Sequence, residues 1–227
     1  MPESSPLFKA FFESPNGLCG QLPPISEISK MEQLETRLHL ITLGNIIDNT
    51  PNLKRWKELI TLEDHWLLDS SQVAYKTSQQ IAQALKEEKT RSPQHIARVW
   101  WQICRGIQGR FAGSIHALLK NSDANALSVQ NYLHQSRTTF PVLSAPITSA
   151  RWLDMIHRAG KIQLTNWGKL RVALPEKQKK AALLFGIHTE QLHPSISLAL
   201  HVWESSCLQL EKDVCGLQNC PKLAPFE

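Results

Sequence analysis

The chain has 227 residues, of which 42% are hydrophobic and 20% are charged, so it can bury a sizeable core and is not a disordered protein. It contains no apolar run long enough to span a bilayer, and its first residues lack the features of a signal peptide, so we expect a cytoplasmic protein. Five cysteines, an odd number, fit a reducing compartment better than a disulfide framework.

The net charge of +5 is distributed unevenly along the chain. Residues 1–90 carry 9 Lys/Arg and 12 Asp/Glu, residues 91–180 carry 14 and 3, and residues 181–227 carry 2 and 5. A segment with such a positive excess attracts polyanions and speeds its encounter with them. The central stretch therefore predicts a nucleic-acid-binding surface, and a solvated surface without a partner is the alternative.

Apolar residues recur mainly at helical spacing, and no alternating pattern is strong enough to predict a sheet. Ser29 followed by Glu32 predicts a capping box near the start of the first helix, and Ser92-Pro93 predicts a serine N-cap with proline at the first helical position. The predicted helices cover, in chain order, about 28–41, 56–60, 73–85, 94–106, 114–120, 124–135, 147–158, 176–185 and 194–211. Residues 167–173 are ambiguous between helix and extended chain.

The most informative stretch is a helix, a tight apolar turn and a second helix within residues 126–158. Such a hairpin can aim backbone N–H groups of the turn and of the next helix start at a phosphate, provided that the turn residues are small. The turn reads Phe140-Pro141-Val142-Leu143-Ser144-Ala145-Pro146. The predicted DNA contacts are Leu143, Ser144 and Ala145, with added charge from Arg151, Arg158 and Lys161. An ordinary helix–helix corner is the alternative.

This turn, with Trp152-Leu153 after it, resembles the helix-hairpin-helix (HhH-GPD) DNA glycosylase superfamily. Residues 172–178, with Ala181, Leu184 and Gly186, occupy the place of the family's segment that leads to its catalytic aspartate. The similarity covers residues 95–221 in the family's order. It implies an all-α, helix-hairpin-helix DNA glycosylase-like fold that binds double-stranded DNA. The chain would then comprise an N-terminal helical segment, 1–90, packed on a DNA-binding part, 91–227.

The sequence departs from the family at the reaction centre. Ile147 stands where lyase-type members carry the attacking lysine, and the aspartate position falls on Pro175; neither side chain can supply that chemistry. Glu176 and Asp154 are the remaining candidate catalytic carboxylates, and an ion pair with Arg158 is the alternative role for Asp154. The hairpin also lacks the usual glycines.

Further residues of the basic stretch are candidates for contacts with DNA. Lys177, Lys179 and Lys180 lie near a helix start, where a bound phosphate would offset their repulsion by the helix dipole. Trp100 and Trp101 are candidates for stacking on a flipped base, and we expect one of the two to belong to the core instead.

The C-terminal cysteines Cys207, Cys215 and Cys220 resemble a worn version of the loop that holds an iron–sulfur cluster in some members of the family. A cluster needs four thiolates, or three with another donor. We therefore expect a loop that has lost its cluster, and a zinc site completed by Cys19, His193 or His201 is the alternative.

Three functions remain in competition on these grounds. The first is a DNA-binding protein on a glycosylase-like scaffold that has lost base excision and holds a flipped base. The second is an enzyme that modifies an extruded DNA base without cutting the glycosidic bond. The third is a helical protein-interaction module whose basic face meets an acidic partner.

Overall fold

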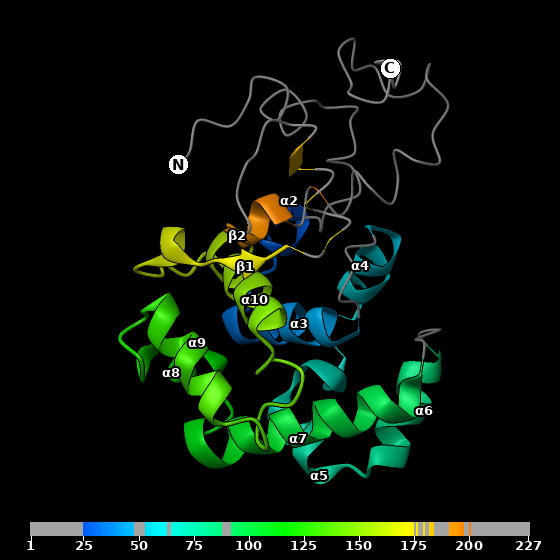
Figure 1. Ribbon diagram of the computed structural model, residues 1–227. Helices are drawn as coiled ribbons and strands as arrows, with labels where there is room; N and C mark the ends of the chain where they lie inside the picture. The colour runs from blue at the N-terminus through cyan, green and yellow to red at the C-terminus, as the bar shows by residue number, and fades with distance from the viewer. Residues whose placement is uncertain are drawn as a thin grey trace, which may run out of the picture.

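The computed structural model describes residues 25–47, 53–62, 65–87 and 92–174, together with 176, 179, 182–183, 191–197 and 200. This part of the chain is mainly helical (Figure 1), which confirms the all-α expectation. None of the described helices is both long and apolar enough to cross a membrane. The elements are α2 (Ile25–Ile28), α3 (Leu34–Ile47), α4 (Leu53–Ile60), η2 (Trp66–Leu68), α5 (Ser70–Tyr75), α6 (Ser78–Glu87), α7 (Pro93–Phe111), α8 (Ile115–Lys120), α9 (Ala126–Gln135), α10 (Pro146–Arg158), η3 (Trp167–Lys169), β1 (Val172–Ala173) and β2 (Gln191–Leu192).

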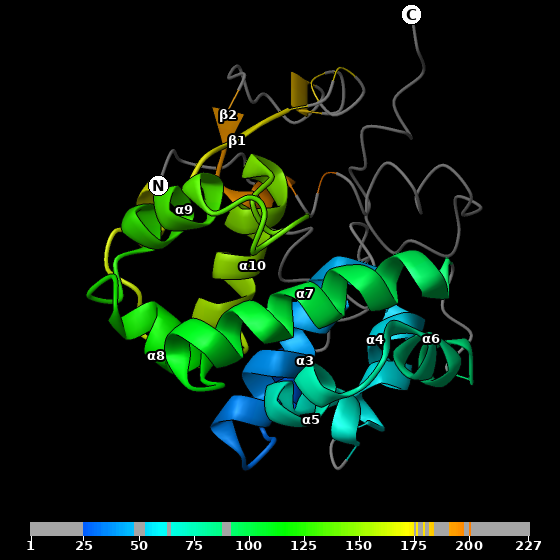
Figure 2. The same ribbon diagram turned by 90° about the horizontal axis from the view of Figure 1, so that it is seen from below.

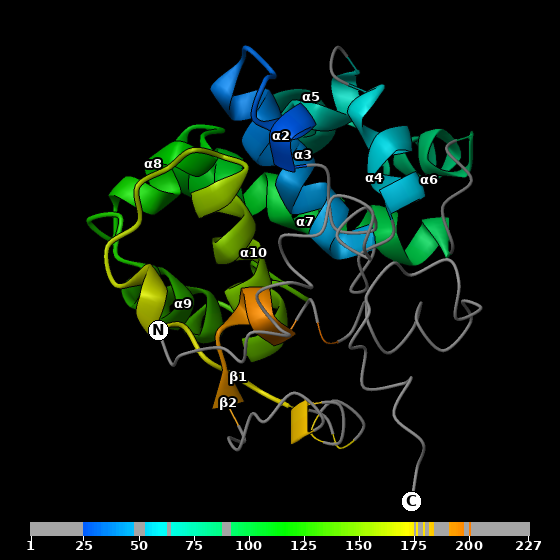
Figure 3. The same ribbon diagram turned by 90° about the horizontal axis from the view of Figure 1, so that it is seen from above.

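Helix α7 runs along the lower side of the molecule in Figure 1, and Figures 2 and 3 show α6 near one of its ends and α8 near the other. It begins after Ser92 as predicted, but Ser92 has a left-handed backbone and its hydroxyl does not cap the helix. The helix continues beyond the predicted end at Gly106, because the burial of Ile107 outweighs the low helix propensity of glycine. Its buried side comprises Ile96, Ala97, Val99, Trp100, Ile103, Cys104 and Ile107.

Helix α3 is buried along nearly its whole length, from Leu38 to Ile46. Its polar side chains are accommodated by local hydrogen bonds: the Thr42 hydroxyl donates to the Leu38 carbonyl at 2.7 Å and the Asn45 amide to the Ile41 carbonyl at 2.8 Å. A single hydrophobic cluster, which includes α3, spans the described chain from Ile28 to Leu170. The N-terminal segment thus contributes to the same core as the hairpin.

Two predicted helices are each divided in the structure. The first, 28–41, is interrupted between α2 and α3, and the Ser29 hydroxyl donates to the Ser26 carbonyl instead of capping the following helix. The capping-box prediction is therefore wrong. The second, 73–85, is separated into α5 and α6, each with its own start: Asp69 caps α5 by accepting N–H bonds from Ser71 and Gln72.

The ambiguous segment after α10 becomes one turn of 3-10 helix followed by a short strand. Strand β1 pairs antiparallel with β2, so that Val172 lies opposite Leu192. Both of these apolar residues are buried, which brings the chain near His193 back against α10 and η3. This return positions the buried polar network described below.

Two helical glycines offer a matched test of the packing. A Cβ added at Gly44 would lie 2.4 Å from the buried ring of Trp56, whereas one added at Gly109 would have no atom within 4 Å. We expect Gly44→Ala to lower the free energy of unfolding by about 1–3 kcal/mol through overpacking. Gly109→Ala should raise it by about 0.5–1 kcal/mol through reduced chain entropy. Urea denaturation checks both, and a stability gain in Gly44→Ala would contradict the packing of α3 against Trp56.

Candidate nucleic-acid interface

Helices α9 and α10 form a hairpin that packs around a buried serine. Asn125 caps α9 by accepting N–H bonds from Leu127 and Ser128. Across the hairpin, the Gln130 amide donates to the Ser149 hydroxyl at 3.1 Å. A ring nitrogen of His134 lies 3.3 Å from the same hydroxyl. The predicted helix–turn–helix arrangement is therefore present, and polar contacts fix the two helices to each other.

The backbone of the turn between them is occupied by internal hydrogen bonds. The N–H groups of Leu143, Ser144 and Ala145 donate to the carbonyls of Pro141, Phe140 and Val142, respectively, at 2.8–3.0 Å. These three amides are thus not aimed outward, and the prediction that the turn itself presents N–H groups to a phosphate is wrong. The physical reason is that a tight turn satisfies its own backbone groups.

The start of α10, where Ile147 is exposed and Thr148 is buried, differs from the turn. Ala145, at the N-cap, makes no side-chain cap, and Pro146 has no N–H to satisfy. The amides of Ile147 and Thr148 have no hydrogen-bond acceptor among the described residues. Ser144 is half-buried, and Ala145 and Ile147 are exposed beside this helix start.

Leu143 and Phe140 anchor the turn in the core, where both are at most 2% exposed. Leu143 is therefore a core residue, and neither its buried side chain nor its internally bonded N–H is available to DNA. Between them, Val142 adopts a left-handed backbone with φ 68°. This conformation is costly for a β-branched residue and is one that glycine adopts freely.

Helix α7 lies against the turn. Gly106 packs on Thr139, and the Gln102 amide donates to the Thr138 carbonyl. Arg110 donates to the Tyr132 hydroxyl at 3.1 Å. These contacts place the exposed side of α7 next to the hairpin.

The two adjacent tryptophans of α7 have different environments. Trp100 is fully buried and donates its indole N–H to the Leu67 carbonyl at 2.9 Å, so it is not available to stack on a base. Trp101 is half-buried, and the Arg105 guanidinium lies 4.7 Å from its ring centroid. The expectation that one of the pair belongs to the core is confirmed, and Trp101 remains the stacking candidate.

Cations dominate the surface of residues 92–174. The only acidic residues in this range are Asp123, which is exposed, and Asp154, which is 1% exposed. The exposed cations are Arg98, Arg105, Arg110, Lys120, Arg137, Lys161, Lys169 and Arg171, and Arg151 and Arg158 are half-buried. A single exposed carboxylate therefore competes with any bound polyanion on this part of the surface.

Asp154 is the centre of a buried polar network. Its Oδ1 accepts from the Ser195 hydroxyl at 2.7 Å and from the Trp167 indole N–H at 3.1 Å, and its Oδ2 lies 3.9 Å from Arg158. His193 joins the network, since its Nδ1 lies 3.0 Å from the same serine hydroxyl. The predicted Asp154–Arg158 pair is present, and the carboxylate holds the segment around Ser195 against α10.

The other predicted site residues lie outside this arrangement. Glu176 is exposed and forms an ion pair with Lys179 at 2.7 Å. The described residues hold no group of three or more His, Cys, Asp or Glu side chains arranged for a metal ion. The remaining predicted residues lie outside the part of the chain that the structure describes. They are Lys177, Lys180, Pro175, His201 and the cysteines Cys19, Cys207, Cys215 and Cys220.

Sequence reasoning missed Arg105, Arg137 and two hydrogen-bond donors to Asp154, Ser195 and Trp167. The i, i+4 spacing of Trp101 and Arg105 on one helix was a usable signal for a cation–aromatic pair. No local pattern connects Asp154 to Ser195, because the two meet only through the β1–β2 pairing. Comparison with known proteins gave no match to a protein-family model, to a curated protein or to a solved structure.

A buried and a half-buried histidine, His39 and His193, make stability depend on pH. Burial lowers the pKa of His39 and of His193 below 6.5, in each case because the protonated ring is poorly solvated. The unfolded chain therefore binds protons below pH 6.5 that the folded chain does not. The free energy of unfolding should fall as the pH drops below 6.5, by up to about 1.4 kcal/mol per pH unit for His39 and by less for the half-buried His193.

Urea denaturation on either side of pH 6.5 checks this dependence. His193→Asn should reduce this dependence, and the part that remains should come from His39. An equal pH dependence in the His193 variant and the wild type would contradict the assignment.

Proposed function

We propose that the protein binds double-stranded DNA through the α9–α10 hairpin and the adjoining exposed side of α7, on a scaffold similar to that of the helix-hairpin-helix DNA glycosylases. The observation that carries the proposal is the concentration of exposed cations on residues 92–174 with one exposed carboxylate. Positive charge of this kind supplies the salt-dependent part of DNA affinity.

The hairpin supports a specific mode of contact. Its second helix begins with two amides, those of Ile147 and Thr148, that lack an acceptor among the described residues. The positive end of the helix dipole lies at the same place. A DNA phosphate could accept hydrogen bonds from both amides and would be attracted to the positive end of the dipole. The left-handed backbone at Val142 also supports the likeness to a family whose hairpins contain glycine.

Base excision does not form part of the proposal. Ile147, at the nucleophile position implied by the resemblance, has an aliphatic side chain that is 36% exposed and cannot attack a sugar. Asp154 is enclosed by Ser195, Trp167 and Arg158, and both of its oxygens face those partners. A buried carboxylate that accepts two hydrogen bonds and pairs with an arginine is better suited to holding the fold than to receiving a substrate.

The binding proposal is tested by measuring affinity for a duplex as a function of salt. We expect affinity to fall steeply with salt, and the double variant Arg105→Gln/Arg137→Gln to reduce the log–log slope by about 2, or about 1 for each DNA phosphate that is no longer neutralised. Lys30→Gln, an exposed cation of the acidic N-terminal segment, is the matched control and should leave the slope unchanged. If the wild type binds neither duplex nor single-stranded DNA at low salt, the proposal is overturned. Abasic product from damaged duplexes would overturn the exclusion of base excision.

Stacking by Trp101 gives a separate test on a duplex with one unpaired base. Trp101→Ala should weaken binding to this duplex by about 1–3 kcal/mol relative to a fully paired one, and Trp101→Phe should recover most of the loss. Competition between the two duplexes in one titration measures the difference. If Trp101→Ala weakens binding to both duplexes equally, Trp101 positions Arg105 and does not stack on a base.

A further inference from the structure

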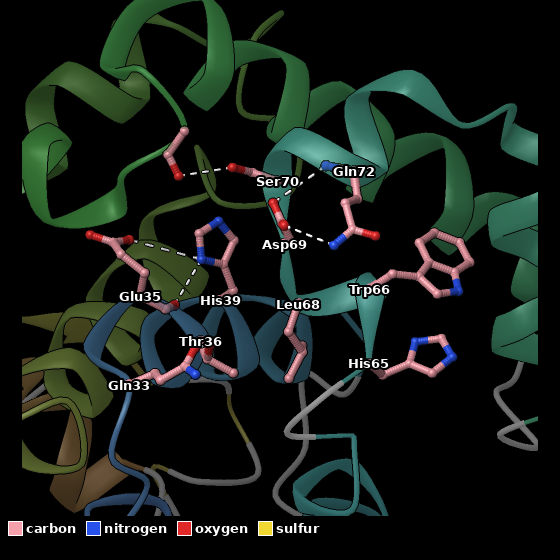
Figure 4. A pocket seen from close by; sticks show the side chains of 11 residues that line it. Gln33, Glu35, Thr36, His39, His65, Trp66, Leu68, Asp69, Ser70 and Gln72 are labelled. Carbon is pink, nitrogen blue, oxygen red and sulfur yellow. Dashed lines mark hydrogen bonds and ion pairs between the residues drawn. The ribbon is translucent and has the colours of Figure 1, made fainter.

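A pocket separate from the basic surface opens between α3, the η2–α5 segment and Gly113. Its volume is about 380 Å³, enough for a small organic molecule. Figure 4 shows Glu35 and His39 projecting from α3, with Asp69 and Ser70 across from them at the start of α5. Trp66 also lines the pocket.

Two carboxylates line this pocket, and none of its lining residues is a lysine or an arginine. Glu35 is 40% exposed and accepts hydrogen bonds from the Ser114 hydroxyl at 2.6 Å and the Ile115 amide at 2.9 Å. Asp69 is fixed by hydrogen bonds from Ser71 and Gln72. Burial opposes ionisation of Asp69, but these hydrogen bonds outweigh it and lower its pKa below the ordinary value. The negative groups are thus held in place by protein contacts.

His39 forms the floor of the pocket and is 2% exposed. Its Nδ1 lies 2.7 Å from the Glu35 carbonyl, which can only accept, so Nδ1 carries the proton. Burial lowers the pKa of His39 and keeps the ring neutral, and Nε2 therefore presents a lone pair. No hydrogen-bond donor of the described chain reaches Nε2. A buried acceptor without a donor is uncommon in folded proteins.

The remaining polar groups add to this acceptor character. The Ser70 hydroxyl donates its proton to the Gly113 carbonyl at 2.8 Å, which leaves the serine oxygen as an acceptor. Trp66 also lines the pocket, but the Lys76 ammonium already lies 5.6 Å from its ring centroid. Acceptors and two carboxylates together suit a ligand that carries positive charge on N–H donors.

We propose that this pocket binds a small organic cation, an alkylammonium or guanidinium group held between Glu35 and Asp69 above the free nitrogen of His39. An anion is excluded by the two carboxylates. The described residues offer no cluster of three or more metal-ligating side chains, so the donor set favours an organic cation over a metal ion. The proposal does not depend on DNA binding, because no residue of the pocket belongs to the hairpin or to α7.

Isothermal titration of the full chain with agmatine, which carries both an ammonium and a guanidinium group, tests the proposal. Putrescine is the probe for the ammonium alone, and succinate is the anionic control. We expect agmatine or putrescine to bind and succinate not to bind. Absence of heat from both cations at millimolar concentration would overturn the proposal.

Charge-neutralising variants locate the site. Asp69→Asn and Glu35→Gln should each weaken cation binding by about tenfold, while Glu27→Gln, an exposed acid that does not line the pocket, should not change it. Equal affinity in all three variants would place binding elsewhere and overturn the assignment.

Because Asp69 and Glu35 also cap helices, a further variant and a spectroscopic measurement separate binding from folding. Asp69→Glu keeps the negative charge and should bind the cation more tightly than Asp69→Asn does. In the wild type, the ¹⁵N resonance of His39 Nε2 should shift on addition of agmatine. An unchanged resonance at saturating agmatine would overturn the placement of the cation above His39.

Discussion

The burial of α3 is the constraint on which the rest of the structure depends. This helix is covered along most of its length. Two hydrogen bonds connect it to α10 and to Gly160, the second residue after α10: the Trp152 indole N–H donates to the Thr42 hydroxyl at 2.9 Å, and Arg37 donates to the Gly160 carbonyl at 3.1 Å. Because Trp152 and Thr42 are both buried, neither could satisfy its polar group with water. The hairpin is thereby fixed to the acidic N-terminal segment rather than held as a separate unit.

The two candidate sites follow from this arrangement and from the distribution of charge. The hairpin and the exposed side of α7 are cationic, while the pocket beside α3 is lined by carboxylates and lies in the acidic part of the sequence. Opposite fields on one small protein attract ligands of opposite sign to different places. Glu35 connects the two parts, since it projects from α3 and accepts hydrogen bonds from the start of α8.

Much of the fold could be predicted from the sequence, because helix formation depends on local spacing. The start of α7 and the hairpin turn agree with the prediction, and the boundaries of α8, α9 and α10 are close to the predicted ones. The breaks between α2 and α3 and between α5 and α6 were missed, since apolar spacing continues through them. At the candidate interface, the sequence indicated the cations and the hairpin. It did not indicate that the turn amides donate hydrogen bonds within the turn, because this depends on the local backbone geometry.

The sequence by itself determined the helical class and the separation of charge, because both reside in residue type and spacing. Only the tertiary structure decided which polar atoms already have a hydrogen-bond partner within the chain. It buries Trp100 and Leu143, uses the amides of the turn internally and encloses Asp154 with Ser195. It also leaves His39 Nε2 without a donor from the described chain. Hydrogen-bond partners and burial arise from residues distant in the chain, so they appear only when the chain is folded.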